Sequence, residues 1–211
     1  MKIYLIRHGE TKWNKQHLLQ GKMDLPLNEN GVYVARLTAE GIRQVKFDAV
    51  YSSPLKRAYE TAQLVTEGRY PIQVDKRLEE IGFGPYEGYC CSREGYNIPD
   101  PEFIYFFTDP GKYVAPEGGE SLQSLCRRTC EFIRELVENP ENAEKTILVS
   151  THGAALRSIL VGLFEIPYDK FWEGGVHRNC GISILDVTDG KITLEQEGVI
   201  YYDEALSTNY E

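Results

Sequence analysis

The stretch Lys2-Ile3-Tyr4-Leu5-Ile6-Arg7-His8-Gly9 begins the chain and indicates the kind of fold that it adopts. Residues 3–6 form an unbroken apolar run, which is typical of a short strand buried on both faces. The strand ends at Arg7 and His8, and Gly9 allows the backbone to turn sharply and to approach a ligand closely. Because ligands collect at the carboxyl edge of an open α/β sheet, the stretch predicts a strand whose end can hold and attack a phosphate.

A second stretch repeats this pattern. The apolar run at 146–151 ends in His152-Gly153, so two of the four histidines of the chain follow a predicted strand and precede a glycine. Taken alone, an Arg-His pair in a turn is more often a chance occurrence. The repetition favours a functional interpretation of both histidines.

Strands and helices alternate along most of the chain. The apolar patterns predict strands at 3–6, 47–51, 72–74, 146–151, 182–187 and 192–201, and helices at 29–43, 54–67, 121–138 and 154–164. We expect Asn28 to cap the first helix, and Ser53, with Pro54 after it, to begin the second. The alternation predicts a three-layer α/β/α sandwich with a mostly parallel central sheet and an antiparallel edge strand, preceded by the hairpin turn Asp189-Gly190.

Two segments lack a clear period. Residues 12–23 are polar and mixed, and we expect a loop over the end of the first strand. Residues 77–119 are rich in proline, tyrosine and phenylalanine. We therefore expect residues 1–211 to form a single domain with a lid-like excursion around 82–119.

The composition limits the partners and the compartment. With 23 basic and 32 acidic residues the net charge is −9, so neither nucleic acid nor an anionic membrane is an expected partner. The chain opens on its first strand, without a signal-peptide layout or a membrane-spanning apolar run, which predicts a cytoplasmic protein. The five cysteines are odd in number and lack C-x-x-C spacing, so we expect packing thiols rather than disulfides or a zinc site.

Three predicted strand ends bring basic groups to one edge of the sheet. They supply Arg7 with His8, Arg57 on the first turn of a helix, and His152. Phosphoryl transfer spreads negative charge over three oxygens, and planar guanidinium groups match those oxygens in pairs. A neutral imidazole can act as the nucleophile, and two nearby arginines disfavour its charged form.

The leaving oxygen of a phosphate ester also needs a proton. The sequence Glu79-Glu80-Ile81 follows the third predicted strand and offers carboxylates near the same edge. We favour Glu80, because Ile81 and Phe83 would give it partly apolar surroundings that help it to remain protonated. Glu79 would then point to solvent.

The motifs together resemble the histidine phosphatase superfamily, also called the phosphoglycerate mutase-like family. The residues that carry the resemblance are Arg7-His8-Gly9-Glu10-Thr11, Asn14, Gln20-Gly21, Ser52-Ser53-Pro54, Arg57, Leu78-x-Glu80-Ile81, Gly84, Glu87-Gly88, Gly118-Gly119-Glu120-Ser121 and His152-Gly153. They follow the order of the family, and as an ordered set they are highly specific. The chain departs from the family at Tyr86, where many members carry Trp, and at Ala154, where the mutases usually carry a second Gly.

The resemblance implies a role for each site residue. His8 would be the nucleophile that becomes phosphohistidine, and Glu80 would be the acid and then the base that activates water. The phosphoryl oxygens would be bound by Arg7, Arg57 and His152. The positions that would line the substrate pocket are Asn14, Gln20, Gly21 and Gly153. The resemblance implies neither a metal ion nor a cofactor.

The resemblance leaves the choice between a phosphatase and a mutase. A mutase needs a second basic clamp for a bisphosphate, yet Tyr89 to Pro116 contains only Arg93 and Lys112 as basic residues, and the tail from Tyr202 to Glu211 is acidic. We therefore predict a metal-independent phosphomonoester hydrolase that acts on a small phosphorylated metabolite. The alternative is a 2,3-bisphosphoglycerate-dependent phosphoglycerate mutase. A non-catalytic phospholigand binder and a protein phosphatase are further alternatives.

Several features remain open in the sequence. His17 and His177 could contact a substrate, and the aromatic segment Tyr105-Phe106-Phe107 with Tyr113 could either line the pocket or fill a core. We interpret Arg127-Arg128 as a solvated helix face. The identity of the ester and the choice between monomer and homodimer are not determined.

Overall fold

The computed structural model describes residues 1–208; residues 209–211, the end of the acidic tail and of the predicted domain, lie outside the described residues. A six-stranded sheet in the order β3-β2-β4-β1-β5-β6 forms its centre. The strands are β1 (Lys2–Arg7), β2 (Ala49–Ser52), β3 (Ile72–Val74), β4 (Thr146–Thr151), β5 (Ile182–Thr188) and β6 (Lys191–Val199). The first four in the sheet order are parallel, whereas β5 and β6 are antiparallel to their neighbours. The predicted architecture is confirmed, with two antiparallel strands rather than one at the edge.

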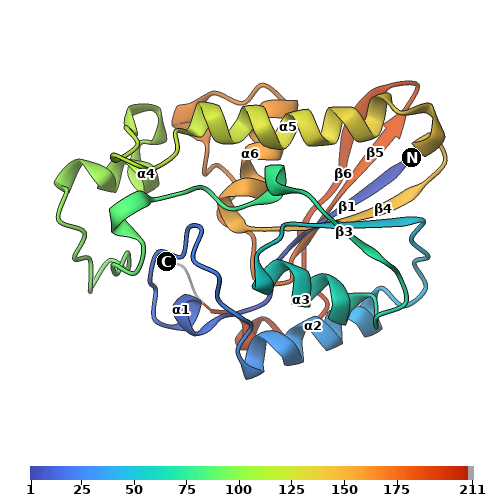
Figure 1. The fold of residues 1–211 in the computed structure, drawn as a ribbon, viewed down its shortest axis with the longest axis horizontal. Helices are drawn as coiled ribbons and strands as arrows, with labels where there is room; N and C mark the ends of the chain where they lie inside the picture. Colours follow the sequence, from blue (N-terminus) through green and yellow to red (C-terminus); the bar gives the residue numbers. More distant parts are fainter. Residues whose placement is uncertain (209–211) are drawn as a thin grey trace.

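Helices cover both faces of this sheet (Figure 1). α5 (Leu122–Glu138) and α6 (Gly153–Leu163) lie on one face, and α2 (Glu29–Gly41) and α3 (Lys56–Val65) lie on the other. Because side chains alternate along a strand, Leu5 of β1 packs in the cluster of α5 and α6, while Ile6 packs in the cluster of α2 and α3. This double burial explains the unbroken apolar run at the start of the chain.

The helix starts agree only partly with the sequence. Asn28 caps α2 as predicted, since its Oδ1 accepts from the Gly31 N–H at 2.7 Å. The predicted start of α3 at Ser53 and Pro54 is wrong, because α3 begins at Lys56 with Leu55 in the cap position. The Ser53 hydroxyl oxygen accepts from the Leu55 N–H at 3.3 Å just before the helix and also contacts His152. A side chain that suits a helix cap is thus used in the candidate site.

The segment 12–23 also differs from the prediction of a plain loop. It begins with a one-turn helix, α1 (Lys12–Lys15). Thr11 and Asn14 form a reciprocal cap: the Asn14 N–H donates to Thr11 Oγ1 at 3.1 Å, and the Thr11 N–H donates to Asn14 Oδ1 at 3.0 Å.

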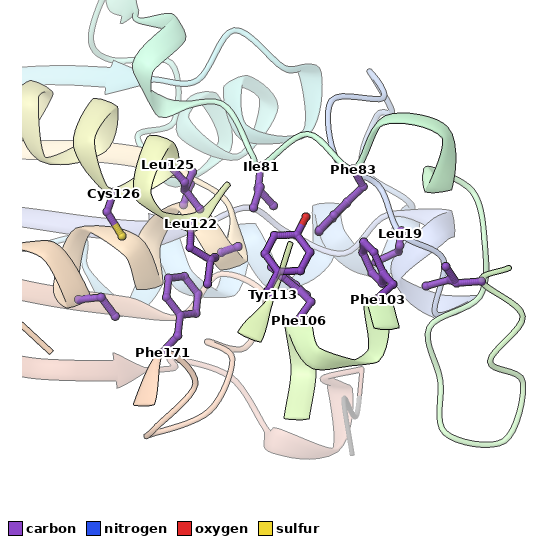
Figure 2. Packing of buried hydrophobic residues seen from close by; sticks show 14 residues of the cluster. Leu19, Ile81, Phe83, Phe103, Phe106, Tyr113, Leu122, Leu125, Cys126 and Phe171 are labelled. Carbon is purple, nitrogen blue, oxygen red and sulfur yellow. The ribbon is translucent and has the colours of Figure 1, made fainter. Parts of the chain in front are cut away.

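The excursion lies beyond the carboxyl edge of the sheet (Figure 1). It contains α4 (Tyr105–Thr108) and short 3-10 helices rather than strands. The 3-10 helices within residues 1–208 are η1 (Lys76–Leu78), η2 (Gly84–Tyr86), η3 (Pro101–Ile104), η4 (Pro110–Lys112), η5 (Pro140–Asn142), η6 (Tyr168–Lys170) and η7 (Glu204–Leu206). Figure 2 shows Tyr113 near Leu122 of α5, and Phe83, Phe103 and Phe106 belong to the same cluster. Their packing holds the excursion against the sheet-flanking helices. No helix among residues 1–208 is long and apolar enough to cross a membrane.

Two glycines allow the loop after β1 to lie against α2. A Cβ on Gly9 would lie 2.8 Å from the Gly31 carbonyl oxygen, and a Cβ on Gly31 would lie 2.1 Å from the Glu10 carbonyl oxygen. Gly9 therefore permits a close approach to the backbone of α2, whereas the sequence analysis expected it to permit a close approach to a ligand.

We expect Gly31→Ala to lower the free energy of unfolding by about 1–3 kcal/mol, because the new methyl group would push the backbone of α2 away from Glu10. Denaturant unfolding followed by circular dichroism measures the change. Gly82→Ala is the control, since a Cβ there would lie 3.4 Å from the flexible Lys22 side chain. Equal stability of the two variants would contradict this account of the packing.

Candidate active site

A cavity of about 120 Å³ lies at the carboxyl edge of the sheet, where β1 and β4 end. Its lining includes the predicted site residues Arg7, His8, Asn14, Gln20, Gly21, Arg57, Glu80 and Gly153. A larger hollow of about 660 Å³ between α2 and α3 is lined, among the described residues, by Glu40, Glu60 and Glu67 with one basic residue, Arg36, and no histidine. An anionic substrate therefore fits the smaller cavity better.

His8 is buried and held in one tautomer. Its Nδ1 lies 2.7 Å from the carbonyl oxygen of Gly9. A carbonyl only accepts, so Nδ1 carries the proton and Nε2 keeps its lone pair in the neutral ring. Burial lowers the pKa of His8 well below its usual range, and the charges of Arg57 and Arg7 lower it further. Burial thus acts alongside the two arginines that the sequence analysis invoked.

Arg57 is fully buried at the start of α3. Its Nε donates to His152 Nδ1 at 3.1 Å, and its two terminal nitrogens donate to the carbonyl oxygens of Met23 at 2.6 Å and Gly21 at 2.7 Å. Burial lowers the pKa of Arg57 to about 10, against the charges of Glu80 and other carboxylates. The guanidinium forms no ion pair with the described carboxylates, so its charge remains available to an anion.

His152 contacts Arg57 and is not part of the cavity lining. Its ring centroid is 5.2 Å from that of His8. Because Arg57 donates to Nδ1, the neutral ring carries its proton on Nε2, which lies 2.8 Å from Ser53 Oγ. Burial lowers the pKa of His152 well below its usual range, and Arg57 is the next cause. The structure therefore gives His152 a supporting contact to Arg57, and its direct contact with a phosphoryl group stays a prediction.

Arg7 reaches the cavity from the end of β1. Its Nη1 donates to the carbonyl oxygen of His177, whose own ring is turned away to Ser183 at 2.6 Å. His177 is absent from the cavity lining, so the backbone rather than the ring of this residue supports the site. Gly153 lies beside the guanidinium, since a Cβ there would be 3.5 Å from Arg7 Nε.

Thr11 orients two amide side chains in the cavity wall. Asn14 Oδ1 accepts from the Thr11 backbone N–H, and Gln20 Oε1 accepts from the Thr11 hydroxyl at 2.9 Å. With both amide oxygens engaged as acceptors, the NH₂ groups are the ends suited to an anion. The sequence motif contained Thr11, but its role appears only in three dimensions.

The conformation of Gly21 connects the arginine to the acidic segment. Gly21 has a φ of +49°, and a Cβ there would lie 2.1 Å from Glu87 Oε1. That same oxygen accepts from the backbone N–H groups of Lys22 at 3.0 Å and Phe83 at 3.1 Å. Glu87 therefore joins the loop at Gly21 and Lys22, whose carbonyl at Gly21 binds Arg57, to Phe83 in the segment after Glu80.

Glu80 occupies the N-terminus of α6. Its carboxylate accepts from the N–H groups of Ala154 at 3.1 Å, Ala155 at 2.9 Å and Ile81 at 2.9 Å. The expectation of partly apolar surroundings captures only part of the environment: Phe83 lines the same cavity, but backbone donors at a helix start also contact the carboxylate. Glu79 does not simply point to solvent either: its side chain is 19% exposed and lies 3.6 Å from Lys22 Nζ.

Arg128 holds this acidic segment in place, so its assignment to a solvated helix face is wrong. Its guanidinium donates to the carbonyl oxygens of Arg77 at 2.8 Å, Glu79 at 2.7 Å and Glu80 at 3.1 Å, and it pairs with Glu120 at 2.7 Å. Only the three-dimensional meeting of α5 with η1 reveals this clamp.

The other half of the cavity wall is apolar. It is formed by Leu18, Leu19, Phe83, Phe106, Phe107, Ala154, Trp172 and Val176. Of the aromatic residues left open by the sequence, Phe106 and Phe107 line the cavity, while Tyr105 and Tyr113 do not. Trp172, which the sequence analysis missed, is fixed by donating to the Phe106 carbonyl at 2.6 Å. Among the described residues, no group of three or more His, Cys, Asp or Glu is placed to hold a metal ion.

We expect stability to fall in acid partly through His177. Burial lowers the pKa of His177 to about 4, and the charges of Arg7 and Arg157 contribute. The unfolded chain takes up this proton near pH 6.5, so the free energy of unfolding falls by about 3 kcal/mol as the pH falls from about 6.5 to about 4. Denaturant titrations across this range should give a shallower acid decline for His177→Gln. An identical decline in the variant would contradict the prediction.

Comparisons with known proteins agree with the resemblance seen in the sequence. The family profile described as histidine phosphatase superfamily (branch 1) matches residues 3–199. Phosphoserine phosphatase 1 of Hydrogenobacter thermophilus is 31% identical over 190 residues, which cover 90% of this chain and 88% of that protein. The adenosylcobalamin/alpha-ribazole phosphatase of Salmonella typhimurium is 31% identical over 196 residues, with coverage of 92% and 95%. The solved structure of Bacillus stearothermophilus YhfR matches with a TM-score of 0.87 at 33% identity, over 95% of this chain and 98% of that one. This chain therefore belongs to branch 1 of the histidine phosphatase superfamily.

Proposed function

We propose that the protein hydrolyses small phosphomonoesters through a phosphohistidine on His8, without a metal ion. The observation that carries the proposal is the state of His8, whose Nε2 is left with a lone pair in a cavity that Arg7 and Arg57 also line. A buried imidazole whose pKa is lowered stays neutral and nucleophilic through neutral and mildly acidic pH.

In the first step, His8 Nε2 attacks phosphorus and the bond from phosphorus to the ester oxygen breaks. Arg7 and Arg57 provide N–H donors for the negative charge on the phosphoryl oxygens, and Asn14 and Gln20 add their amide NH₂ groups. His152 and Ser53 keep the Arg57 side chain in place for this task.

Glu80 is the acid and base of the proposal. It gives a proton to the leaving oxygen in the first step, and in the second it takes a proton from the water that attacks the phosphohistidine. His8 is released and inorganic phosphate leaves. The N-terminus of α6 and the Arg128 clamp hold Glu80 at the cavity throughout.

Hydrolysis is favoured over the mutase reaction by the distribution of charge. Two arginines, Arg7 and Arg57, line the cavity together with no lysine from the described part of the chain, and the opposite wall is apolar. Within this cavity, therefore, the described lining offers no second basic clamp for the distal anion of a bisphosphate. The relatives named as phosphoserine and alpha-ribazole phosphatases support the same choice.

The cavity volume and the free thiols complete the proposal. About 120 Å³ suits a phosphoryl group and nearby atoms of a small ester better than a protein surface.

All five cysteines are free, which fits the cytoplasm. The site draws on residues from Arg7 to Val176, so we treat residues 1–211 as one functional domain, acting as a monomer or homodimer.

We expect Glu80→Gln to lower kcat/KM roughly 10²- to 10⁴-fold, because the amide can neither donate the acidic proton nor activate water. Phosphorus NMR in excess chelator, with phosphoserine, 3-phosphoglycerate plus a trace of 2,3-bisphosphoglycerate, and 4-nitrophenyl phosphate, follows the products. Glu79→Gln is the matched control and should stay within about threefold of the wild type.

Wild-type rates in Glu80→Gln would contradict the role of Glu80. Formation of 2-phosphoglycerate without release of inorganic phosphate would instead identify a mutase.

A further inference from the structure

A second cavity of about 440 Å³ adjoins the phosphate cavity, and we call it the side chamber. It is lined by His17, Cys91, Ser92, Arg93, Tyr96, Ile104, Phe107, Thr108 and Val176. The steps attributed above to the candidate active site use none of these side chains. The question is what the side chamber can bind.

The two cavities share part of their walls. Phe107 and Val176 line both of them. The loop after β1 also contributes to both cavities: His17 lines the side chamber, and the next residue, Leu18, lines the phosphate cavity. The two cavities therefore adjoin at Phe107 and Val176, and a group attached to a phosphate on His8 would pass these two residues to reach the larger space.

Hydrogen bonds attach the outer wall of the side chamber to the catalytic loop. The backbone N–H of Cys91 donates to the His17 carbonyl oxygen at 2.9 Å, and its thiol donates to the same oxygen at 3.1 Å. Leu18 forms a β-bridge with Cys90. The chamber wall thus has a fixed position relative to residues 14–21, which contribute to the phosphate cavity.

The chemistry of the lining indicates the kind of group that fits. Phe107, Ile104, Val176 and the ring of Tyr96 supply apolar surface. The basic side chains are His17 and Arg93, and the lining contains no Asp or Glu. Arg93 forms no ion pair within residues 1–208, in a chain whose net charge is −9.

From these observations we infer that the side chamber binds the leaving group of the ester, and that it selects an extended, largely apolar group ending in a carboxylate or another anion. This inference rests on the proposed phosphatase function and adds the substrate class to it. The apolar part would lie along Phe107, Ile104 and Val176, and the terminal anion would meet Arg93. Phosphoserine has a short leaving group that carries an ammonium beside its carboxylate, so it has no apolar chain to place in this chamber.

A series of alkyl phosphates tests the apolar part. Ethyl, butyl, hexyl and octyl phosphate have leaving groups of similar basicity, so differences in kcat/KM report binding of the chain. We expect kcat/KM to rise roughly twofold to fourfold for each added methylene, mainly through KM. Equal values of kcat/KM across the series would overturn the inference.

Filling the chamber should remove this dependence. Thr108 lines the side chamber and not the phosphate cavity. In Thr108→Trp we expect kcat/KM for ethyl phosphate to stay within about twofold, while the advantage of octyl phosphate falls at least tenfold. The control is Val114→Trp in the same excursion, at a residue that is 77% exposed and lines neither cavity. An unchanged advantage of octyl phosphate in Thr108→Trp would also overturn the inference.

Arg93→Gln tests the terminal anion. Wild-type protein should prefer 7-carboxyheptyl phosphate over its carboxyl methyl ester, and Arg93→Gln should reduce that preference by about twofold to fivefold, because Arg93 is exposed, with unchanged kcat for ethyl phosphate. An equal preference in the variant would exclude Arg93 as the anion partner and overturn that part of the inference.

The same assays separate the two proposals. If the wild type releases no inorganic phosphate from any alkyl phosphate or from 4-nitrophenyl phosphate, the phosphatase function itself fails, and the inference fails with it. If phosphate is released with no dependence on chain length, the phosphatase function stands and only the side-chamber inference fails.

Discussion

The burial of the Arg57 guanidinium is the constraint on which the site depends. Its N–H groups donate to His152 and to the carbonyl oxygens of Met23 and Gly21, not to a carboxylate. Taking a cation out of water without a counter-charge costs several kcal/mol. The oriented carbonyl dipoles offset part of this cost, and a bound phosphoryl group would offset more. The same arrangement keeps His8 and His152 neutral beside it.

This constraint extends through the loops around the cavity. The carbonyl of Gly21 can face Arg57 because Gly21 adopts a positive φ beside Glu87, and Glu87 in turn binds the Phe83 N–H. From there the chain enters the aromatic cluster that forms the apolar wall (Figure 2). Glu87 therefore connects the polar half of the cavity, at Gly21, to the apolar half, at Phe83.

Sequence patterns predicted what depends on short-range order. The runs at 3–6 and 146–151 gave two parallel neighbours, β1 and β4, whose ends carry His8 and His152. The patterns failed where a side chain is recruited by a distant part of the fold. Ser53 looked like a helix cap but contacts His152, and Arg128 looked solvated but holds the backbone around Glu80. Such contacts depend on how α3, α5 and β4 meet, which no local spacing records.

The central claim is that His8 becomes phosphorylated during turnover. The most direct measurement is to mix the wild type with 4-nitrophenyl phosphate in excess chelator, to quench with denaturant at alkaline pH within milliseconds, and to locate any added phosphoryl group by peptide mass spectrometry. The account predicts one phosphoryl group on the peptide that contains His8. In the control, which uses inorganic phosphate in place of the ester, this peptide should carry no phosphoryl group. Hydrolysis with no phosphoryl group on His8 at any quench time, and unchanged hydrolysis by His8→Ala, would contradict it.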